Sequence, residues 1–234
     1  MMLDLFKSFP YLGLAYRFPT LYRLLPGEFP YYFTLAELDQ MVALQQLPPG
    51  ALVLDIGCGE GVMALHLARQ RDDLYILGID NSAEMLHTAT EQAESAGFTH
   101  CAFVLQDSDQ LSQSVIDGYC RQHHFPIQAP MLITAILSFS AMAHYARVID
   151  QLVTLLPANG VLFTLDMWRR RTPLNYIGHF LCENLLVAAN SFRPIQQHLA
   201  NRLTDCRSVE KKIRDDITGI GTMEPFMFRG RRQS

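Results

Sequence analysis

A glycine cluster and a downstream aspartate are the residues whose types and spacing could do chemistry. The apolar run 51–56 leads into Asp55-Ile-Gly57-Cys-Gly59-Glu-Gly61, and Asp80 stands 25 positions after Asp55, at the end of a second apolar run. Glycines two residues apart let the backbone turn sharply and let a ligand approach without meeting a Cβ atom. A carboxylate at the end of the second strand can accept hydrogen bonds from both hydroxyls of a ribose. The pattern therefore predicts a crevice for a nucleoside.

Polar residues follow three further apolar runs. Gln106-Asp107-Ser108 follows the run 101–105, Ser138-Phe139-Ser140 follows 131–137, and Asp166-Met167-Trp168 follows 161–165. In an open parallel sheet, ligands bind beyond the carboxyl ends of the strands. We therefore expect all these side chains at the same edge of the sheet as the glycine cluster, with those of 106–108 placed to read an adenine amino group. Asp107 equally suits the N-cap of a helix, and one carboxylate can do both.

The runs themselves indicate the fold. The segments 51–56, 74–79, 101–105, 131–137 and 161–165 are apolar throughout rather than alternating, which is typical of strands buried on both faces of a parallel sheet. Helical periodicity lies between them, for example over Leu86, Ala89 and Ala93 before Gly97. Strands alternating with helices predict a doubly wound, mostly parallel α/β sheet over about 50–167, with helices on both faces.

The two flanks of this core differ from it. Residues 1–33 hold ten of the 24 aromatic residues and four prolines, and Thr34-Leu-Ala-Glu37 opens a helix that Pro48-Pro49-Gly50 must end. We expect residues 1–49 to form an aromatic helical lid and 50–234 the main domain. Within that domain, 168–205 is a mostly helical insertion interrupted at Pro194, and 208–214 and 222–229 are closing strands.

Four segments together resemble a known family. VLDIGCGEG (53–61), GID (78–80), LQDSD (105–109) and LLPANGVLF (155–163) are similar to class I S-adenosylmethionine-dependent methyltransferases, over roughly residues 34–167. GTMEPFMFRGRR (221–232) more loosely resembles the closing strand of ubiquinone/menaquinone-type and lipid methyltransferases. The resemblance implies a seven-stranded sheet whose last strand is antiparallel. It also implies S-adenosylmethionine as cofactor and S-adenosylhomocysteine as product. The family usually opens its fourth strand with an acidic residue, where this chain has Ala129-Pro130-Met131.

The resemblance also assigns roles to residues of this chain. They share a place at the predicted cofactor crevice. Asp55, Gly57, Cys58 and Gly59 would line the methionine end, Asp80 would hold the ribose hydroxyls, Asn81 and Met85 would flank the adenosine, Asp107 and Ser108 would lie by the adenine, and Leu137 and Ser138 under the sulfonium.

Two other functions compete with methyl transfer. A nicotinamide-dependent oxidoreductase would place the third glycine of its dinucleotide motif at position 62, which is Val62, so the spacing disfavours that enzyme. A non-catalytic S-adenosylmethionine-binding sensor or partner subunit keeps the same crevice without transfer, since fold alone does not fix function.

Candidates for the chemistry and for the acceptor come from the same strand ends and the flanks. A general base is needed only where the acceptor must lose a proton, and His144 and Asp166 are the candidates; for His144 a packed or surface position is the alternative. Tyr16, Tyr22, Tyr31, Tyr32 and Trp168 are candidates for the acceptor pocket, and the tyrosines could also cage a cationic amine. Two apolar flanks favour a small, fairly apolar acceptor such as a quinone precursor, a lipid headgroup or a secondary metabolite.

The composition and charge of the chain narrow its expected partners, metal content and cellular compartment. A formal charge of −4 and a pI near 6.0 disfavour nucleic acid as a partner. No apolar run reaches the length of roughly 18 residues that a membrane span needs, and the first residues do not read as a signal peptide. Five cysteines without a Cys-x-x-Cys pair are typical of reduced thiols in a cytoplasmic protein. His123-His124 and His179 with Cys182 lack further ligands, so no metal is expected. Arg229, Arg231 and Arg232 are expected in solvent, with contact to an anionic lipid as the alternative.

Overall fold

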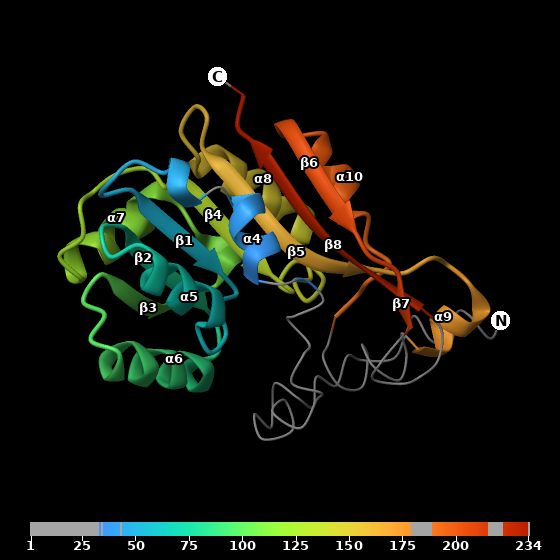
Figure 1. The fold of residues 1–234 in the computed structure, drawn as a ribbon, viewed down its shortest axis with the longest axis horizontal. Coiled ribbons are helices and arrows are strands. Elements are labelled where there is room, and N and C mark those ends of the chain that lie inside the picture. Colours follow the sequence, from blue (N-terminus) through green and yellow to red (C-terminus); the bar gives the residue numbers. More distant parts are fainter. Residues whose placement is uncertain (1–32, 34, 43, 179–188, 215–221, 234) are drawn as a thin grey trace.

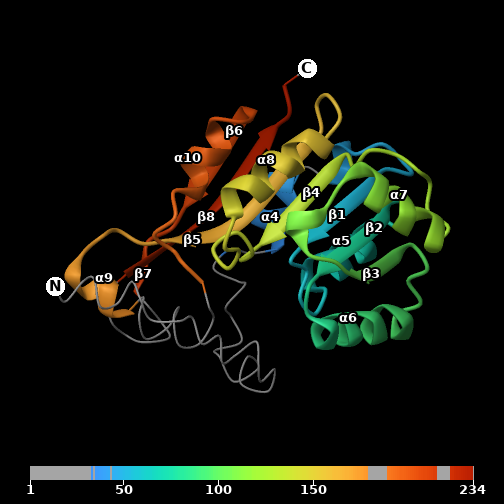
Figure 2. The same cartoon turned by 180° about the vertical axis from the view of Figure 1, so that it is seen from behind.

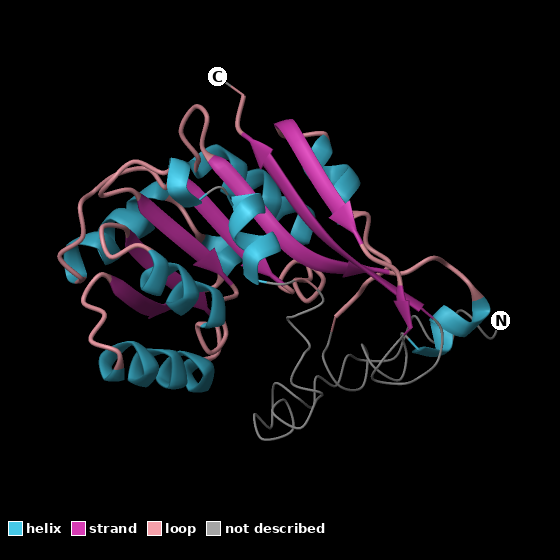
Figure 3. Cartoon of the chain, viewed as in Figure 1, coloured by secondary structure: helices cyan, strands magenta, loops and turns pink. Residues whose placement is uncertain are grey.

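One twisted sheet between two layers of helices forms the protein (Figures 1 and 3). The structure is a computed structural model that describes residues 33, 35–42, 44–178, 189–214 and 222–233. The strands are β1 Leu52–Ile56, β2 Tyr75–Asp80, β3 Cys101–Leu105, β4 Leu132–Ile136, β5 Val161–Trp168, β6 Thr204–Glu210, β7 Ile213–Arg214 and β8 Thr222–Arg231. The helices are α4 Leu35–Val42, α5 Val62–Gln70, α6 Ala83–Ser95, α7 Gln113–Gln122, α8 Tyr145–Leu155, α9 Pro173–Gly178 and α10 Ile195–Ala200, with 3-10 turns η1 Leu44–Gln46 and η2 Ser108–Gln110.

The strand order confirms the predicted sheet. Seven strands lie in the order β3-β2-β1-β4-β5-β8-β6, and the two-residue β7 pairs with β8 beside this path. The five strands from β1 to β5 pair in parallel, whereas β8 is antiparallel to both β5 and β6. Because β1 lies next to both β2 and β4, the strand order reverses there, which is where this kind of sheet binds ligands.

Two apolar layers hold the helices to the sheet. Leu38 of α4, Met63 of α5 and Ala93 of α6 belong to the layer on one face. Ile116 of α7, Ile149 of α8 and the apolar side of α10 belong to the layer on the other face (Figure 2). The five residues of β1 are all buried, since helices cover both of its sides. The predicted burial of β1 on both faces is therefore confirmed.

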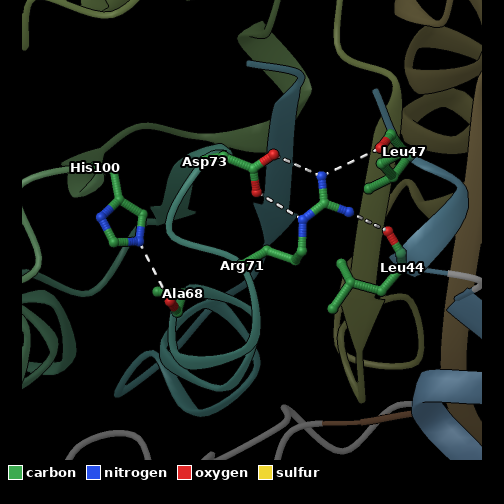
Figure 4. Close-up of polar contacts among 6 residues, drawn as sticks. All are labelled: Leu44, Leu47, Ala68, Arg71, Asp73 and His100. Atoms are coloured by element: carbon green, nitrogen blue, oxygen red, sulfur yellow. Dashed lines mark hydrogen bonds and ion pairs between the residues drawn. The ribbon is translucent and has the colours of Figure 1, made fainter. Parts of the chain in front are cut away.

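The first described helix is shorter than predicted. Helix α4 ends at Val42 and is followed by η1, rather than continuing to Pro48. The carbonyls that follow the helix find a partner from elsewhere, because the guanidinium of Arg71 donates to the oxygens of Leu44 and Leu47 (Figure 4). Asp73 holds that guanidinium through two oxygens, at 2.6 and 2.8 Å. This contact joins the end of α5 to the segment that leads into β1.

The closing part of the chain begins earlier than predicted. Strand β6 starts at Thr204 rather than Ser208, with a register shift between Thr204 and Arg207 where it pairs with β8. Arg229 is buried, at 5% exposure, rather than in solvent. Arg232 donates to the carbonyl oxygens of Thr154 and Leu156 and thereby caps α8. The predicted solvent exposure is therefore wrong for Arg229, because β8 is an interior strand.

The flanks are described only in part. Residues 1–32, which carry most of the expected aromatic lid, lie outside the described residues. Phe33 is buried, and Lys211 lies 4.4 Å from the centre of its ring. In the insertion, α9 covers Pro173–Gly178 and α10 begins at Ile195, directly after Pro194, where a break is expected; residues 179–188 lie outside the described residues. Over the residues described, the structure contains no helix with the length and apolar character of a membrane span.

Candidate functional site

The glycine loop after β1 is held by the neighbouring strand. The N–H groups of Gly57 and Cys58 both donate to the carbonyl oxygen of Ile79 on β2, at 2.8 and 3.1 Å. The N–H of Gly59 donates to Oδ2 of Asp80 at 2.8 Å. The other oxygen of Asp80 accepts from the N–H of Ser82 at 2.9 Å. Asp80 therefore fixes the loop and the start of α6 while it remains partly exposed at the sheet edge.

Glycine is required at position 57 by a close approach from β4. Gly57 has φ +64°, and a Cβ atom there would lie 2.6 Å from Oγ of Ser138. Gly59 has φ +53°, but a Cβ atom there would meet nothing within 4 Å. Ser138 can come this near because Leu137 turns the chain with φ +53°, a conformation that costs a side-chain-bearing residue about 1–2 kcal/mol. The hydroxyl of Ser138 lies 2.8 Å from the carbonyl oxygen of Ile56, to which it can donate.

Asp55 is a buried carboxyl at the wall of the crevice. Its Oδ1 accepts from the hydroxyl of Thr134 at 2.7 Å and its Oδ2 from the N–H of Ala64 at 3.2 Å. Burial raises the pKa of Asp55 to about 7; the two hydrogen bonds oppose the rise and the charge of Asp80 adds to it. Asp55 is thus able to change its charge near neutral pH. Burial and the nearby carboxylates raise the pKa of the Cys58 thiol well above its usual range, so this thiol stays protonated.

The segment after β3 completes the polar edge. The side chain of Asp107 accepts from the N–H of Asp109 at 3.0 Å and caps η2. The predicted capping role of Asp107 is therefore confirmed, although η2 is a 3-10 turn. On the adjacent helix α6, Ser82 accepts from the N–H of Met85, and Met85 is buried.

A cavity of about 590 Å³ lies at this edge of the sheet. Every residue predicted for cofactor binding lines it: Asp55, Gly57, Cys58, Gly59, Asp80, Asn81, Met85, Asp107, Ser108, Leu137 and Ser138. Several other lining residues had no predicted part in cofactor binding, although Glu60, Ser140 and Met167 lie in segments that were predicted at this edge of the sheet: Leu38, Glu60, Met63, His66, Asp109, Ser140, Ala141, Met142, Met167 and Ala189. The structure therefore brings the predicted residues together, without testing what they bind.

None of the described residues predicted as a general base or for the acceptor pocket lines the cavity. His144 is exposed, precedes α8 as its N-cap, and is not among the cavity-lining residues. Asp166 is fully buried behind the cavity wall. Trp168 packs against the apolar core rather than lining the cavity. The four candidate tyrosines of the acceptor pocket lie outside the described residues: Tyr16, Tyr22, Tyr31 and Tyr32. His179 and Cys182 lie outside them as well.

The loop after β4 is held from three sides. Asp166 accepts from the N–H of Ser140 at 2.9 Å, and Asn190 donates its N–H to the carbonyl oxygen of Ser140 at 2.7 Å. The guanidinium of Arg193 donates to the carbonyl oxygens of Phe139, Ser140 and Met142. Burial raises the pKa of Asp166 to about 6, which its hydrogen bonds oppose. Residues from the insertion therefore position a wall of the cavity whose described lining residues carry no charged side chain.

Comparisons with known proteins agree with this architecture. A family model described as a methyltransferase domain matches residues 48–212. The chain is 35% identical over 65 residues to a probable (S)-tetrahydroprotoberberine N-methyltransferase 2 of Papaver bracteatum, a match to 28% of this chain and 18% of that protein. It is 31% identical over 112 residues to carboxy-S-adenosyl-L-methionine synthase of Campylobacter fetus, which covers 47% of this chain and 48% of that protein. The matches span less than half of these relatives.

A solved structure supports the same fold at low sequence identity. The YcgJ protein from Bacillus subtilis superposes with a TM-score of 0.63 at 16% identity, covering 86% of this chain and 100% of that chain. A sequence identity this low is evidence for the fold alone. The family match covers most of the described sheet, from the segment before β1 through β6. The chain therefore belongs to the methyltransferase-domain family, in the class I group that its sequence resembles.

Proposed function

We propose that this chain binds S-adenosylmethionine in the cavity and transfers its methyl group to a small, fairly apolar acceptor. The observation that carries the proposal is the junction of the glycine loop with Asp80, because both border one cavity beside the point of strand reversal. Membership of the methyltransferase-domain family supports the same conclusion.

The residues at the cavity fit such a cofactor. A Cβ atom at Gly59 would meet nothing within 4 Å, so its absence leaves open backbone for a methionine tail, whereas the missing Cβ atom at Gly57 makes room for Ser138. In the proposal, Asp80 accepts from the ribose hydroxyls, with Asn81 and Met85 beside the adenosine. Asp107 and Ser108 lie by the adenine, and Leu137 and Ser138 lie under the sulfonium. Asp55, Gly57, Cys58 and Gly59 line the methionine end. A cofactor with two positive charges also suits the carboxylates of this wall.

The chain's part in the reaction is mainly positioning. The bound cofactor supplies a methyl carbon on a positively charged sulfur, and the acceptor attacks that carbon in line. Ser138 is fixed against Ile56, and Ser140 is fixed by Asp166, so both sit on rigid backbone. Holding the reacting atoms close and aligned can supply about 7–11 kcal/mol of the barrier. Met167 is buried and Leu137 is partly buried, and their apolar side chains make this part of the cavity unfavourable for water.

The acceptor is inferred from the uncharged wall. Beyond Leu137 and Ser138, the described lining residues contributed by the loop after β4, by β5 and by the insertion are Ser140, Ala141, Met142, Ala143, Met167 and Ala189. Small and apolar side chains with one hydroxyl suit a neutral, apolar molecule. A quinone precursor, a lipid headgroup or a secondary metabolite each has such a face, and the proposal covers this class.

Binding and turnover test the proposal separately. Calorimetric titration should give saturable binding of S-adenosylmethionine and S-adenosylhomocysteine and none of NAD; the opposite preference would end the proposal. Incubation with the methyl-labelled cofactor and fractions of a cell extract should label a small, extractable product. Tight cofactor binding with no labelled product in any fraction favours a sensor or partner subunit instead. Asp80→Ala is the matched control that should lose both signals.

A further inference from the structure

Among the described residues, the ionisable side chains that line the cavity are acidic, with one basic exception. The described lining residues include the carboxylates of Asp55, Glu60, Asp80, Asp107 and Asp109. The side chain of His66 is the sole member of this described lining that can become positively charged. Five acidic groups suit a ligand with cationic parts, while any anionic part needs a donor or a cation of its own.

S-adenosylmethionine has one anionic part, the carboxylate of its methionine. The backbone of the glycine loop is mostly unable to serve it, because its N–H groups are already engaged. Gly57 and Cys58 donate to Ile79, Gly59 donates to Asp80, and Gly61 donates to the carbonyl oxygen of Cys58. A donor for the carboxylate must then come from a neighbouring element.

His66 occupies such an element. It lies on α5, the helix that begins directly after the glycine loop, one turn beyond Val62 and Met63, which also line the cavity. Its side chain is 11% exposed, and Nε2 lies 2.7 Å from Oδ1 of Asp39 on α4. That contact fixes the ring, and Nδ1 is the ring nitrogen that it does not use. A doubly protonated imidazole donates from both nitrogens, so it can join two carboxylates.

We propose that His66, oriented by Asp39, binds the methionine carboxylate of the cofactor and makes the cavity selective for a donor that carries this group. The inference rests on the proposed function. Asp39 acts here as a positioning residue, because it holds the ring from α4. The His66 and Asp39 pair thereby ties the helix before β1 to the helix after it when the cofactor binds.

The test compares two ligands that differ in one carboxylate. Calorimetry of the full chain with S-adenosylmethionine and with its decarboxylated analogue should show about tenfold to hundredfold tighter binding of the former. In His66→Phe, which keeps a ring but has no donor, the affinity for S-adenosylmethionine should fall by that factor. The affinity for the decarboxylated analogue should stay within about twofold, so the ratio approaches one.

Further variants separate a specific role from packing. His66→Gln retains one donor and should restore part of the ratio, and Asp39→Asn should reduce it. His87→Phe is the matched control, because His87 pairs with Glu91 on the exposed side of α6, outside the cavity lining. An unchanged ratio in His66→Phe, or an equal loss for both ligands, overturns the inference. If neither ligand binds the natural protein, the proposed function itself fails, which is a distinguishable result.

Discussion

The cavity has two halves that are held in different ways. The half formed after β1, β2 and β3 is held by neighbours in the sheet, as when Asp80 binds the N–H of Gly59. The half formed after β4 and β5 is held by residues from the insertion, since Asn190 and Arg193 bind the loop at Ser140. Charge differs as well, because the first half carries carboxylates and the second carries none in the described lining.

Under the proposed function, this difference separates the part of the cavity that recognises the cofactor from the part that recognises the acceptor. A half whose shape comes from adjacent strand ends is specified by short motifs, and its geometry is shared by relatives that bind the same molecule. A half held by a distant insertion can change with that insertion while the sheet stays the same. We therefore expect variants in the two halves to affect different measurements.

The largest effect is expected at Gly57. In Gly57→Ala the new Cβ atom meets Ser138 at 2.6 Å and the residue keeps a positive φ, so we expect a loss of about 2–5 kcal/mol in the free energy of unfolding. Gly59→Ala carries the same backbone cost without a neighbour, and should lose about 1–2 kcal/mol. Urea denaturation of both variants measures the difference. Equal losses would show that the approach of Ser138 is not restrictive.

Asp80→Ala tests the half that binds the cofactor. The variant removes the proposed acceptor of the ribose hydroxyls and the partner of Gly59, so affinity for S-adenosylmethionine should fall by about 1.5–3 kcal/mol. Isothermal titration calorimetry gives the dissociation constant. Asp73→Ala, at the opposite end of β2, is the control and should leave the constant unchanged. A constant that does not move in Asp80→Ala would remove this residue from the site.

Arg193→Met tests the other half. Three carbonyls of the loop after β4 lose a donor, although that of Ser140 keeps the N–H of Asn190, and we expect about 1–3 kcal/mol less stability together with a higher KM for the acceptor. The dissociation constant for the cofactor should stay within about twofold. Arg202→Met is the control, because its exposed ion pair with Asp150 is worth less than about 1 kcal/mol. A large change in cofactor affinity would argue against two separate halves.

Proton release should accompany cofactor binding through Asp55. Its pKa of about 7 in the free protein will fall when a cationic ligand stabilises the carboxylate. Affinity should therefore rise with pH up to about pH 7, by at most about tenfold per unit. In the free protein the raised pKa has the reverse effect on stability, which falls as pH rises from about 4 to about 7. Calorimetry in two buffers of different ionisation enthalpy measures the number of protons released on cofactor binding, and Asp55→Asn should abolish this release.

The smallest effect is expected at His144. The side chain is exposed, makes no capping hydrogen bond and does not line the cavity. His144→Ala should change the free energy of unfolding by less than about 0.5 kcal/mol and leave turnover unchanged. Thermal melting and the methyl-transfer assay measure both. A loss of activity would assign to His144 a role that its position does not explain.

Local patterns made the sheet and the cofactor half predictable. Continuous apolar runs mark β1 to β5, and the glycine spacing with Asp80 marks the edge that holds the cavity, since these signals lie within a few residues of each strand end. His66 was missed because its partner Asp39 is 27 positions away and a lone histidine on a helix forms no motif. Arg193 was missed for the same reason. The early start of β6 was missed because that strand is exposed and has no apolar run.

The position of β8 has a consequence for how the protein is made. Strand β8 lies between β5 and β6, although it follows β6 in the chain. Strand β5 ends at Trp168, whereas β8 begins only at Thr222, so β5 is made well before its antiparallel partner. Until β8 is made, the edge of β5 that faces it stays open, with the N–H and C=O groups of that edge unpaired. The nascent chain thus passes through a stage with one open strand edge, where binding by a chaperone would protect against aggregation.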